Sequence, residues 1–479
     1  MLKDPLLEET PEKRPSEEAH PPNNTIQTPP DASVSQLAKL LAISTIPLIL
    51  TNMTRYLNET FALHFLKSLG ELEVLDAYAL AASLISLVCM AIFSSLGTGL
   101  TSRASQAFGA ENYQLVGLYL HKSLIINLII FIPVAACFYF SDQICLVMGY
   151  DALIAQYIQQ MLSLSIPGMF ALMIFLTITA YLNGCNHFAV PGMVEVASCF
   201  LDWTCNYIFI GRMRLGIKGA AISTNISSFS SLIVLVIYLA KWNPAPNTLF
   251  WPYKESFLKV WEHFVYQVWL GSMAYLEWIA YEVILIFSGR LDSIQLTSTA
   301  IAYANSGLVY GIPYGFINTV LAFTGNALGE KNIIKAKNSI KAGVLCSVVS
   351  MVLVEVYYVF FSELVARFYV DDEQTVQETT RYFHAYLLQI PPEFIQLILS
   401  SGLRAIGKEK IGTLLMLLGF YFIAIPASYL LCFTFKLGGI GLIFGPALNQ
   451  YLLLIAILIV YCKIDWNAQL SIVLKGLSV

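Results

Sequence analysis

Long runs of apolar residues, about twenty or more at a time and separated by short polar stretches, constrain this chain more than any other feature. A helix of about twenty apolar residues crosses the roughly 30 Å hydrocarbon core of a bilayer. Composition agrees, since 57% of the residues are hydrophobic and only 12% are charged, whereas soluble domains carry about 25% charged residues. The sequence therefore predicts an all-α integral membrane protein with many crossings.

The apolar runs predict twelve transmembrane helices in two groups of six. They cover residues 37–66, 75–102, 115–140, 152–181, 190–211, 217–240, 264–289, 294–325, 342–361, 377–403, 411–433 and 439–461. The polar stretch 242–262 predicts a linker between an N-terminal lobe at 37–241 and a C-terminal lobe at 263–463. Residues 1–36 are polar and rich in Pro and Glu, which is typical of a disordered tail, and 464–479 is predicted to be a second tail.

Three pairs of short motifs, about 220 residues apart, indicate that the two lobes share one plan. The pairs are QAFGAENYQ (from Gln106) with NALGEKNII (from Asn326), the helix breaks near Leu182 and Leu403, and LGIKGAAIS (from Leu215) with LGGIGLIFG (from Leu437). Because six crossings return the chain to its starting side, the repeat should be parallel, with substrate bound between pseudo-symmetric lobes.

The basic residues predict the orientation. With the N-terminus taken as cytoplasmic, eighteen of the 27 Lys and Arg residues fall on the cytoplasmic side, eight fall on the opposite side, and Arg55 lies within a span. Basic residues are retained on the cytoplasmic side, so both termini are expected there. The net charge of -4 gives no indication of a nucleic-acid partner.

Several longer motifs occur in an order and spacing that resemble a known family. They are SLGELEVLDAYALA (from Ser68), SQAFGAENYQLVGLYL (from Ser105), YLEWIAYEVILIFSG (from Tyr275), YGIPYGFINTVLAFTGNALGEKN (from Tyr310) and LRAIGKEKIGTLLMLLGFYFIAIP (from Leu403). Together they resemble the multidrug and toxic compound extrusion (MATE) transporters, in the eukaryotic branch, over residues 37–463.

This resemblance implies a V-shaped pair of six-helix lobes that exports organic cations or other xenobiotics in exchange for protons or sodium. It implies no nucleotide cofactor, and the chain has no GxxxxGK[ST] phosphate-binding loop. We expect no cofactor apart from the coupling ion, and a monomer surrounded by the lipid bilayer. The expected location is the plasma membrane or a vacuolar or endosomal membrane.

Carboxylates within the spans are the strongest candidates for function, because a charge at mid-membrane costs about 2.5–3.5 kcal/mol on insertion scales. Glu277, Glu282 and Glu393 fall where the resemblance implies functional carboxylates. Glu277 and Glu282 are separated by about 140° around one helix, so they cannot point at one spot. We expect a proton to compete with an organic cation for Glu277 and Glu393, since burial disfavours the charged carboxylate.

Aromatic residues near these carboxylates could contact a cation. Trp278, Tyr303 and Tyr310 offer ring faces that attract positive charge, but packing or a place in the interfacial belts explains them equally well. Two positions depart from the family pattern, because Ala304 and Thr101 stand where some relatives have acidic residues. The substrate range is therefore not expected to be identical to theirs.

The first lobe has a weaker set of polar candidates. Asp202 and Asn206 lie four residues apart where relatives often have two Asn, and they predict either a protonatable site or, equally, helix capping or hydrogen bonding between helices. Glu59 lies one helical turn after Arg55, so a local ion pair is the slightly favoured interpretation. Glu355 has no matched role and is interpreted as structural.

Three other functions remain as alternatives. An organic-anion or flavonoid exporter of the same family is the nearest, and a lipid flippase is the next. A membrane-embedded enzyme is disfavoured, because the six His residues are dispersed and form no HExxH motif.

Overall fold

The computed structural model describes residues 29, 31–67, 70, 72–242 and 247–477, without the side chains of 55–57, 59, 60 and 72. The predicted disordered tail, apart from its last few residues, lies outside this part of the chain. All regular elements within the described residues are helices. An all-helical architecture is expected for a chain in lipid, because helices satisfy every backbone polar group internally.

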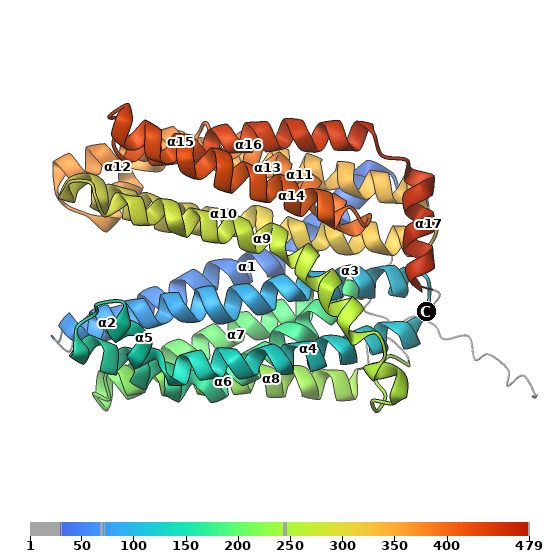
Figure 1. The fold of residues 1–479 in the computed structure, drawn as a ribbon, viewed down its shortest axis with the longest axis horizontal. Helices are drawn as coiled ribbons and strands as arrows, with labels where there is room; N and C mark the ends of the chain where they lie inside the picture. The colour runs from blue at the N-terminus through green and yellow to red at the C-terminus, as the bar shows by residue number, and fades with distance from the viewer. Residues whose placement is uncertain (1–28, 30, 68–69, 71, 243–246, 478–479) are drawn as a thin grey trace, which may run out of the picture.

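The described helices fall into two groups, with α1–α8 in one and α9–α16 in the other (Figure 1). The first group comprises α1 (Val34–Lys67), α2 (Leu72–Leu84), η1 (Ile85–Met90), α3 (Ala91–Gly109), α4 (Tyr113–Tyr139), α5 (Ser141–Val147), α6 (Ala152–Gly184), α7 (Ala189–Asn206), η2 (Tyr207–Arg212) and α8 (Ile217–Lys241). The second comprises α9 (Val260–Ser288), α10 (Ser293–Gly329), α11 (Ile333–Tyr369), α12 (Glu373–Tyr386), α13 (Ile390–Ala405), α14 (Glu409–Gly419), η4 (Phe420–Ala424), α15 (Ile425–Tyr429), η5 (Leu430–Thr434) and α16 (Gly439–Cys462). The short helix η3 (Lys254–Phe257) precedes α9, and α17 (Trp466–Leu477) ends the described chain.

Twelve crossings are consistent with these helices. Ten helical segments of the described chain are long and apolar enough to span a membrane on their own. The other two predicted spans are 190–211, which is α7 with the π-helical turn η2, and 377–403, which is α12 and α13 with a turn between them. Both contain acidic residues or an interruption, which shortens their apolar stretch.

The two groups meet near α17 and diverge toward the ends of α2 and α12, giving the V-shape (Figure 1). Helix α1 joins them, because it packs against α7 of its own lobe and against α10 and α11 of the other. Its buried residues Leu37, Leu41 and Leu48 belong to an apolar core that also contains Phe316 and Val320 of α10. The lobes are therefore held together by packing as well as by the linker.

Glycines let α3 and α10 touch where the lobes meet. A Cβ atom on Gly109 would collide with the backbone of Asn326, and one on Gly329 would collide with the backbone of Gln106. These four residues belong to the first pair of repeated motifs, QAFGAENYQ and NALGEKNII. The repeat thus forms a pseudo-two-fold contact, here called the closed end.

Side-chain amides reinforce the closed end in the same symmetric way. The Gln106 amide donates to the carbonyl oxygen of Ala405 at the end of α13, over 3.0 Å. The Asn326 amide donates to the carbonyl oxygen of Gly184 at the end of α6, over 3.3 Å. Each lobe therefore supplies a donor from its second spanning helix to the end of the other lobe's fourth.

The segment predicted as a C-terminal tail contains helix α17, which lies across the closed end (Figure 1). Leu477 is part of the first lobe's apolar core, whereas Val473 is part of the core shared by α1 and the second lobe. The hydroxyl of Tyr119 in α4 donates to the carbonyl oxygen of Gly476 over 3.1 Å. Residues 466–477 thus bridge the two lobes.

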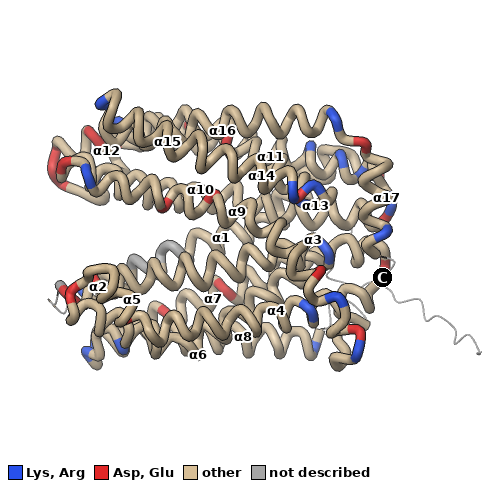
Figure 2. Tube along the Cα trace, viewed as in Figure 1, with Lys and Arg blue, Asp and Glu red and all other residues tan. Residues whose placement is uncertain are grey.

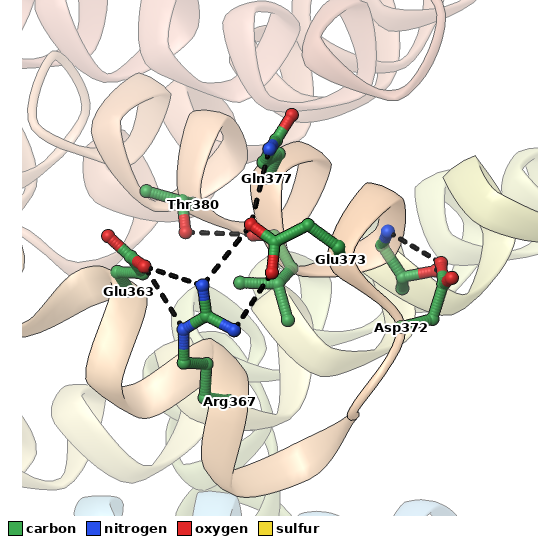
Figure 3. Close-up of polar contacts among 8 residues, drawn as sticks. Glu363, Arg367, Asp372, Glu373, Gln377 and Thr380 are labelled. Atoms are coloured by element: carbon green, nitrogen blue, oxygen red, sulfur yellow. Dashed lines mark hydrogen bonds and ion pairs between the residues drawn. The ribbon is translucent and has the colours of Figure 1, made fainter.

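Charged residues gather at the two ends of the helices, with Lys and Arg densest around the closed end (Figure 2). The opposite end has an acidic corner between α11 and α12 (Figure 3). There Arg367 forms ion pairs with Glu363 at 2.8 Å and Glu373 at 2.9 Å. Asp372 caps α12 by accepting from the backbone nitrogen of Thr375.

Candidate functional site

Glu277 is buried in the middle of α9, inside the second lobe. Only 3% of the residue is exposed, so its carboxyl group needs partners from the protein. The Gln450 amide, on α16, donates to Glu277 Oε1 over 3.2 Å. Glu277 Oε2 is also buried and has no hydrogen-bond partner among the described residues, which leaves one oxygen ready for a proton or a cation.

Glu393, in the first turn of α13, is held by two neighbours. The Gln389 amide donates to Glu393 Oε2 over 3.1 Å, and the Tyr281 hydroxyl of α9 donates to Glu393 Oε1 over 3.3 Å. The turn at Leu387–Gln389 separates α12 from α13 and places Gln389 one helical turn before the glutamate. Both oxygens of Glu393 therefore have donors.

Tyr281 joins the two carboxylates into one network. Its oxygen accepts from the Gln389 amide over 2.8 Å and from the Gln450 amide over 3.5 Å. A continuous path therefore runs from Glu277 through Gln450 and Tyr281 to Glu393. We refer to these five residues as the second-lobe network.

Two further polar residues, Arg404 and Tyr310, interact with the second-lobe network. The buried guanidinium of Arg404 is a positive charge close enough to attract Glu277. The charges of Glu277 and Glu393 repel each other and both act on the hydroxyl of Tyr310. Two acidic groups with one buried arginine can hold a proton or a cation in this region without accumulating net charge in the membrane interior.

A small pocket opens beside the network, between α9, α10, α12 and α16. Tyr281 and Gln389 form part of its wall, together with Tyr303 and Tyr386. The Tyr303 hydroxyl donates to Glu282 Oε1 over 3.3 Å. Glu282 thus has a different partner from Glu277, as expected from their angular separation on α9.

The remaining aromatic candidates lie on the same two helices. Trp278 is half-buried on α9, next in the chain to Glu277. Tyr310 is half-buried on α10, and its ring centroid lies 6.2 Å from that of Tyr314. Tyr310 therefore forms an aromatic pair with Tyr314, which lines a pocket between the first lobe and α10.

The first-lobe candidates are only partly brought together. The Asn206 amide donates to Asp202 Oδ2 over 2.9 Å, and both residues are buried. Asp202 Oδ1 has no hydrogen-bond partner among the described residues. The side chains of Glu59 and Arg55 lie outside the described part, so their predicted ion pair is left as a prediction.

Sequence reasoning missed four polar residues, three in the second-lobe network and one in a pocket between the lobes. Gln389, Gln450 and Tyr281 hold the carboxylates, and Glu195 of α7 lines a separate polar pocket between the lobes. The position of Glu195 inside an apolar stretch of sequence could have identified it as a candidate. No group of three His, Cys, Asp or Glu residues in the described chain could hold a metal ion.

The sequence profile of the MatE family matches residues 47–208 and 271–430, one segment in each lobe. The chain belongs to the MatE family. MatE proteins are membrane transporters and not enzymes, and this chain is accordingly an integral, multi-pass membrane transporter. The predicted resemblance and the predicted fold class are both confirmed.

Relatives from animals and plants match along nearly the whole chain. Multidrug and toxin extrusion protein 1 of Rattus norvegicus is 28% identical over 430 residues, covering 88% of this chain and 74% of its own length. Protein DETOXIFICATION 9 of Arabidopsis thaliana is 25% identical over 434 residues, covering 90% of each chain. This chain thus resembles both an animal and a plant member of the family.

Solved structures show the same fold. The crystal structure of the eukaryotic MATE transporter AtDTX14 superposes with a TM-score of 0.85 at 20% identity, covering 93% of this chain and 99% of that one. The Vibrio cholerae MATE transporter VcmN in its bent form superposes with a TM-score of 0.79 at 16% identity, covering 92% and 98%. The V-shaped pair of helical lobes is therefore the fold of this family.

Proposed function

We propose that this MatE protein exports organic cations by exchanging them for protons, through alternating access between the two lobes. The observation that carries the proposal is the second-lobe network, in which two buried glutamates are joined by Tyr281 and two amides. Keeping two carboxylates in a membrane interior is costly, and ion exchange is a function that requires them. The names of the animal and plant relatives, which refer to extrusion and detoxification, support export.

In the proposed cycle, a proton and the substrate cation compete for the carboxylates. A charged carboxylate attracts a cation, and burial disfavours the charged form once the cation has left. Protonation from outside would then displace the cargo, and release of the proton to the cytosol would reset the site. Each ligand favours the arrangement of the lobes that it binds better, which couples proton entry to cation export.

The orientation is part of the proposal. The closed end, around which Lys and Arg are densest (Figure 2), is assigned to the cytoplasm, because basic residues are retained on that side. The described arrangement would then be the outward-open form, with both termini cytoplasmic. We further propose a monomer in a plasma, vacuolar or endosomal membrane, with no cofactor apart from the coupling ion.

The test is uptake of radiolabelled tetraethylammonium into proteoliposomes under an imposed pH gradient. We expect Glu277→Gln and Glu393→Gln to reduce gradient-driven uptake more than ~10-fold, and Tyr281→Phe to reduce it less, because Gln389 still holds Glu393. Glu355→Gln on α11 is the matched control, since it makes the same chemical change outside the network. Normal uptake by both network glutamine variants would exclude the proposal.

Two further arms of the same assay separate the alternatives. Replacing the pH gradient by a sodium gradient distinguishes the coupling ion, and sodium-driven uptake at neutral, equal pH would assign sodium in place of protons. Offering radiolabelled citrate in place of tetraethylammonium tests for an anion exporter. Citrate transport without tetraethylammonium transport would overturn the assignment of cationic substrates.

A further inference from the structure

Helix α17 packs onto the closed end through one side. Its buried and half-buried residues include a set spaced at i, i+3, i+4, i+7, i+8 and i+11, a pattern that gives a helix one buried face. These residues are Trp466, Gln469, Leu470, Val473, Leu474 and Leu477. Ile472 lies outside this face and is 54% exposed. The helix therefore follows the closed end along its whole length.

The buried face of α17 is divided between the two lobes. Trp466, Leu470 and Val473 pack into the core shared by α1 and the second lobe. Leu474 and Leu477 pack into the core of the first lobe. The helix contacts agree, since α17 meets α10 and α11 of the second lobe and α3 of the first (Figure 1). The last turn of α17 thus lies on the first lobe, and the preceding turns lie on the second lobe and α1.

Polar groups of the first lobe hold this last turn. The hydroxyl of Tyr119 on α4 donates to the carbonyl oxygen of Gly476 over 3.1 Å. Arg103 of α3 lies beside the same glycine, because a Cβ atom on Gly476 would meet its guanidinium group. Arg103 is itself held by the ring of Tyr266 on α9, whose centroid lies 4.2 Å from Cζ. A positive charge at the C-terminal end of a helix is favourable, because the last carbonyl groups carry partial negative charge.

The start of α17 is attached to the second lobe. A connection of three residues joins it to the end of α16. Asp465 caps the helix by accepting from the backbone nitrogens two and three residues further on, over 3.0 and 3.2 Å. Lys337 of α11 places its Nζ 5.1 Å from the ring centroid of Trp466, which is a favourable cation–π distance. If the lobes separate here, α17 should therefore move with the second lobe.

We propose that α17 is a latch, whose last turn docks on α3 and α4 to keep the closed end shut and undocks when the lobes separate there. An element fixed to both sides of a contact has to release one side before the contact opens. The side released is the first lobe, because it holds one turn of α17 and has no short covalent connection to it. The latch rests on the alternating access in the proposed function, but it does not depend on which cargo is carried.

Hydrogen–deuterium exchange of the full chain in lipid nanodiscs, followed by mass spectrometry, tests the latch. We expect Leu477→Ser to speed amide exchange ~10-fold in the last turn of α17 and in the closed-end segments QAFGAENYQ and NALGEKNII, because exchange reports local opening. The turns of α17 from Trp466 to Val473 should stay protected. Ile472→Ser is the matched control, since it makes a similar change on the exposed side of the same helix, and it should leave exchange unchanged.

Tyr119→Phe is a milder second variant. It removes the hydroxyl that donates to Gly476 but keeps the ring in the first lobe's core, so it tests the latch even if Leu477→Ser does not fold. We expect closed-end exchange to rise about threefold, since one hydrogen bond of the docked turn is lost.

The outcomes separate the latch from the proposed export. Release of the last turn of α17 without faster exchange at the closed end would overturn the latch, and so would equal acceleration along the whole of α17. If Leu477→Ser, Tyr119→Phe and Ile472→Ser exchange alike while wild-type proteoliposomes take up tetraethylammonium, export stands and the latch fails. If exchange follows the expectation but wild-type protein carries no tetraethylammonium, the latch stands and the proposed cation export fails.

Discussion

The two lobes share their closing contacts and their outer helix caps. At the closed end, each lobe sends one side-chain amide, from Gln106 or Asn326, to a helix end of the other lobe. At the outer end, Asp151 caps α6 and Asp372 caps α12, and these residues are 221 positions apart. Positions that recur in both lobes therefore serve the fold.

The two lobes differ in their buried charged and polar residues. The same offset relates Gly184 to Ala405, the last residues of α6 and α13. It places Leu172 at the position of Glu393 and Gly168 at the position of Gln389, so the first lobe cannot form the second-lobe network. Because repetition preserves contacts required for folding, the unrepeated polar residues are the ones that carry specific chemistry.

Breaking the shared contact between α3 and α10 should have the largest effect. We expect Gly109→Leu and Gly329→Leu to lower the stability of the protein by about 1–3 kcal/mol or more, because each side chain would collide with the backbone of the other helix. The measurement is the thermal midpoint in detergent, followed by size-exclusion chromatography. Gly289→Leu is the control, since that position has ordinary space for a Cβ atom.

The pseudo-symmetry of the closed end also predicts how the two glycine variants compare with each other. The two collisions are nearly equivalent, so the two variants should lose similar stability. A large loss in one variant with none in the other would show that the closed end is not the symmetric contact described here.

Removing the amides should have a smaller effect that differs between the lobes. The Asn326 amide donates to Gly184 and also to Asn186 Oδ1 and the Ala322 carbonyl oxygen, whereas among the described residues that of Gln106 donates to Ala405 alone. We expect Asn326→Leu to lower the free energy of unfolding by about 1–3 kcal/mol. Gln106→Leu should lower it less, because fewer acceptors lose their donor. Thermal midpoints under the same conditions test the order, and a reversed order would contradict it.

Much of the fold could be predicted from the sequence because the bilayer dictates helix length. The apolar runs predict spans close to the observed helices, and the motif repeat predicts the pseudo-symmetry. Helix α17 was missed because a twelve-residue amphipathic segment resembles a polar tail in sequence. It is stabilised by contacts of Val473 and Leu477 with two different cores, which only the assembled lobes provide.

The candidate site was less predictable. A carboxylate in an apolar run stands out by its solvation cost, which identified Glu277 and Glu393. Their partners did not stand out, because Gln450 is 173 residues from Glu277 in sequence and meets it only through the packing of α16 on α9. Likewise, the pocket that Glu195 lines exists only through the packing of the neighbouring helices, so the sequence of α7 alone does not show that Glu195 faces it.

The outer caps provide the smallest expected difference between the lobes. Asp372 accepts hydrogen bonds from both the hydroxyl and the backbone nitrogen of Thr375, and these bonds lower the pKa of its carboxyl group. A lowered pKa means that the folded chain is stabilised above the unfolded value of about 3.9 and loses this contribution as pH falls through the folded value. Asp372→Ala should therefore lower the thermal midpoint slightly at pH 7, and the difference from wild type should shrink toward pH 3.

The matched variant for this comparison is Asp151→Ala. Asp151 accepts from the backbone nitrogen of Leu153, and leucine has no hydroxyl to add a second bond of the kind that Thr375 gives Asp372. In the second lobe, Arg367 also lowers the pKa of Glu373, next to Asp372, so the acidic corner as a whole is most stable above the ordinary carboxylate range. The drop in the thermal midpoint at pH 7 should consequently be larger for Asp372→Ala, and a larger drop for Asp151→Ala would contradict the assignment of the extra stabilisation to the second lobe.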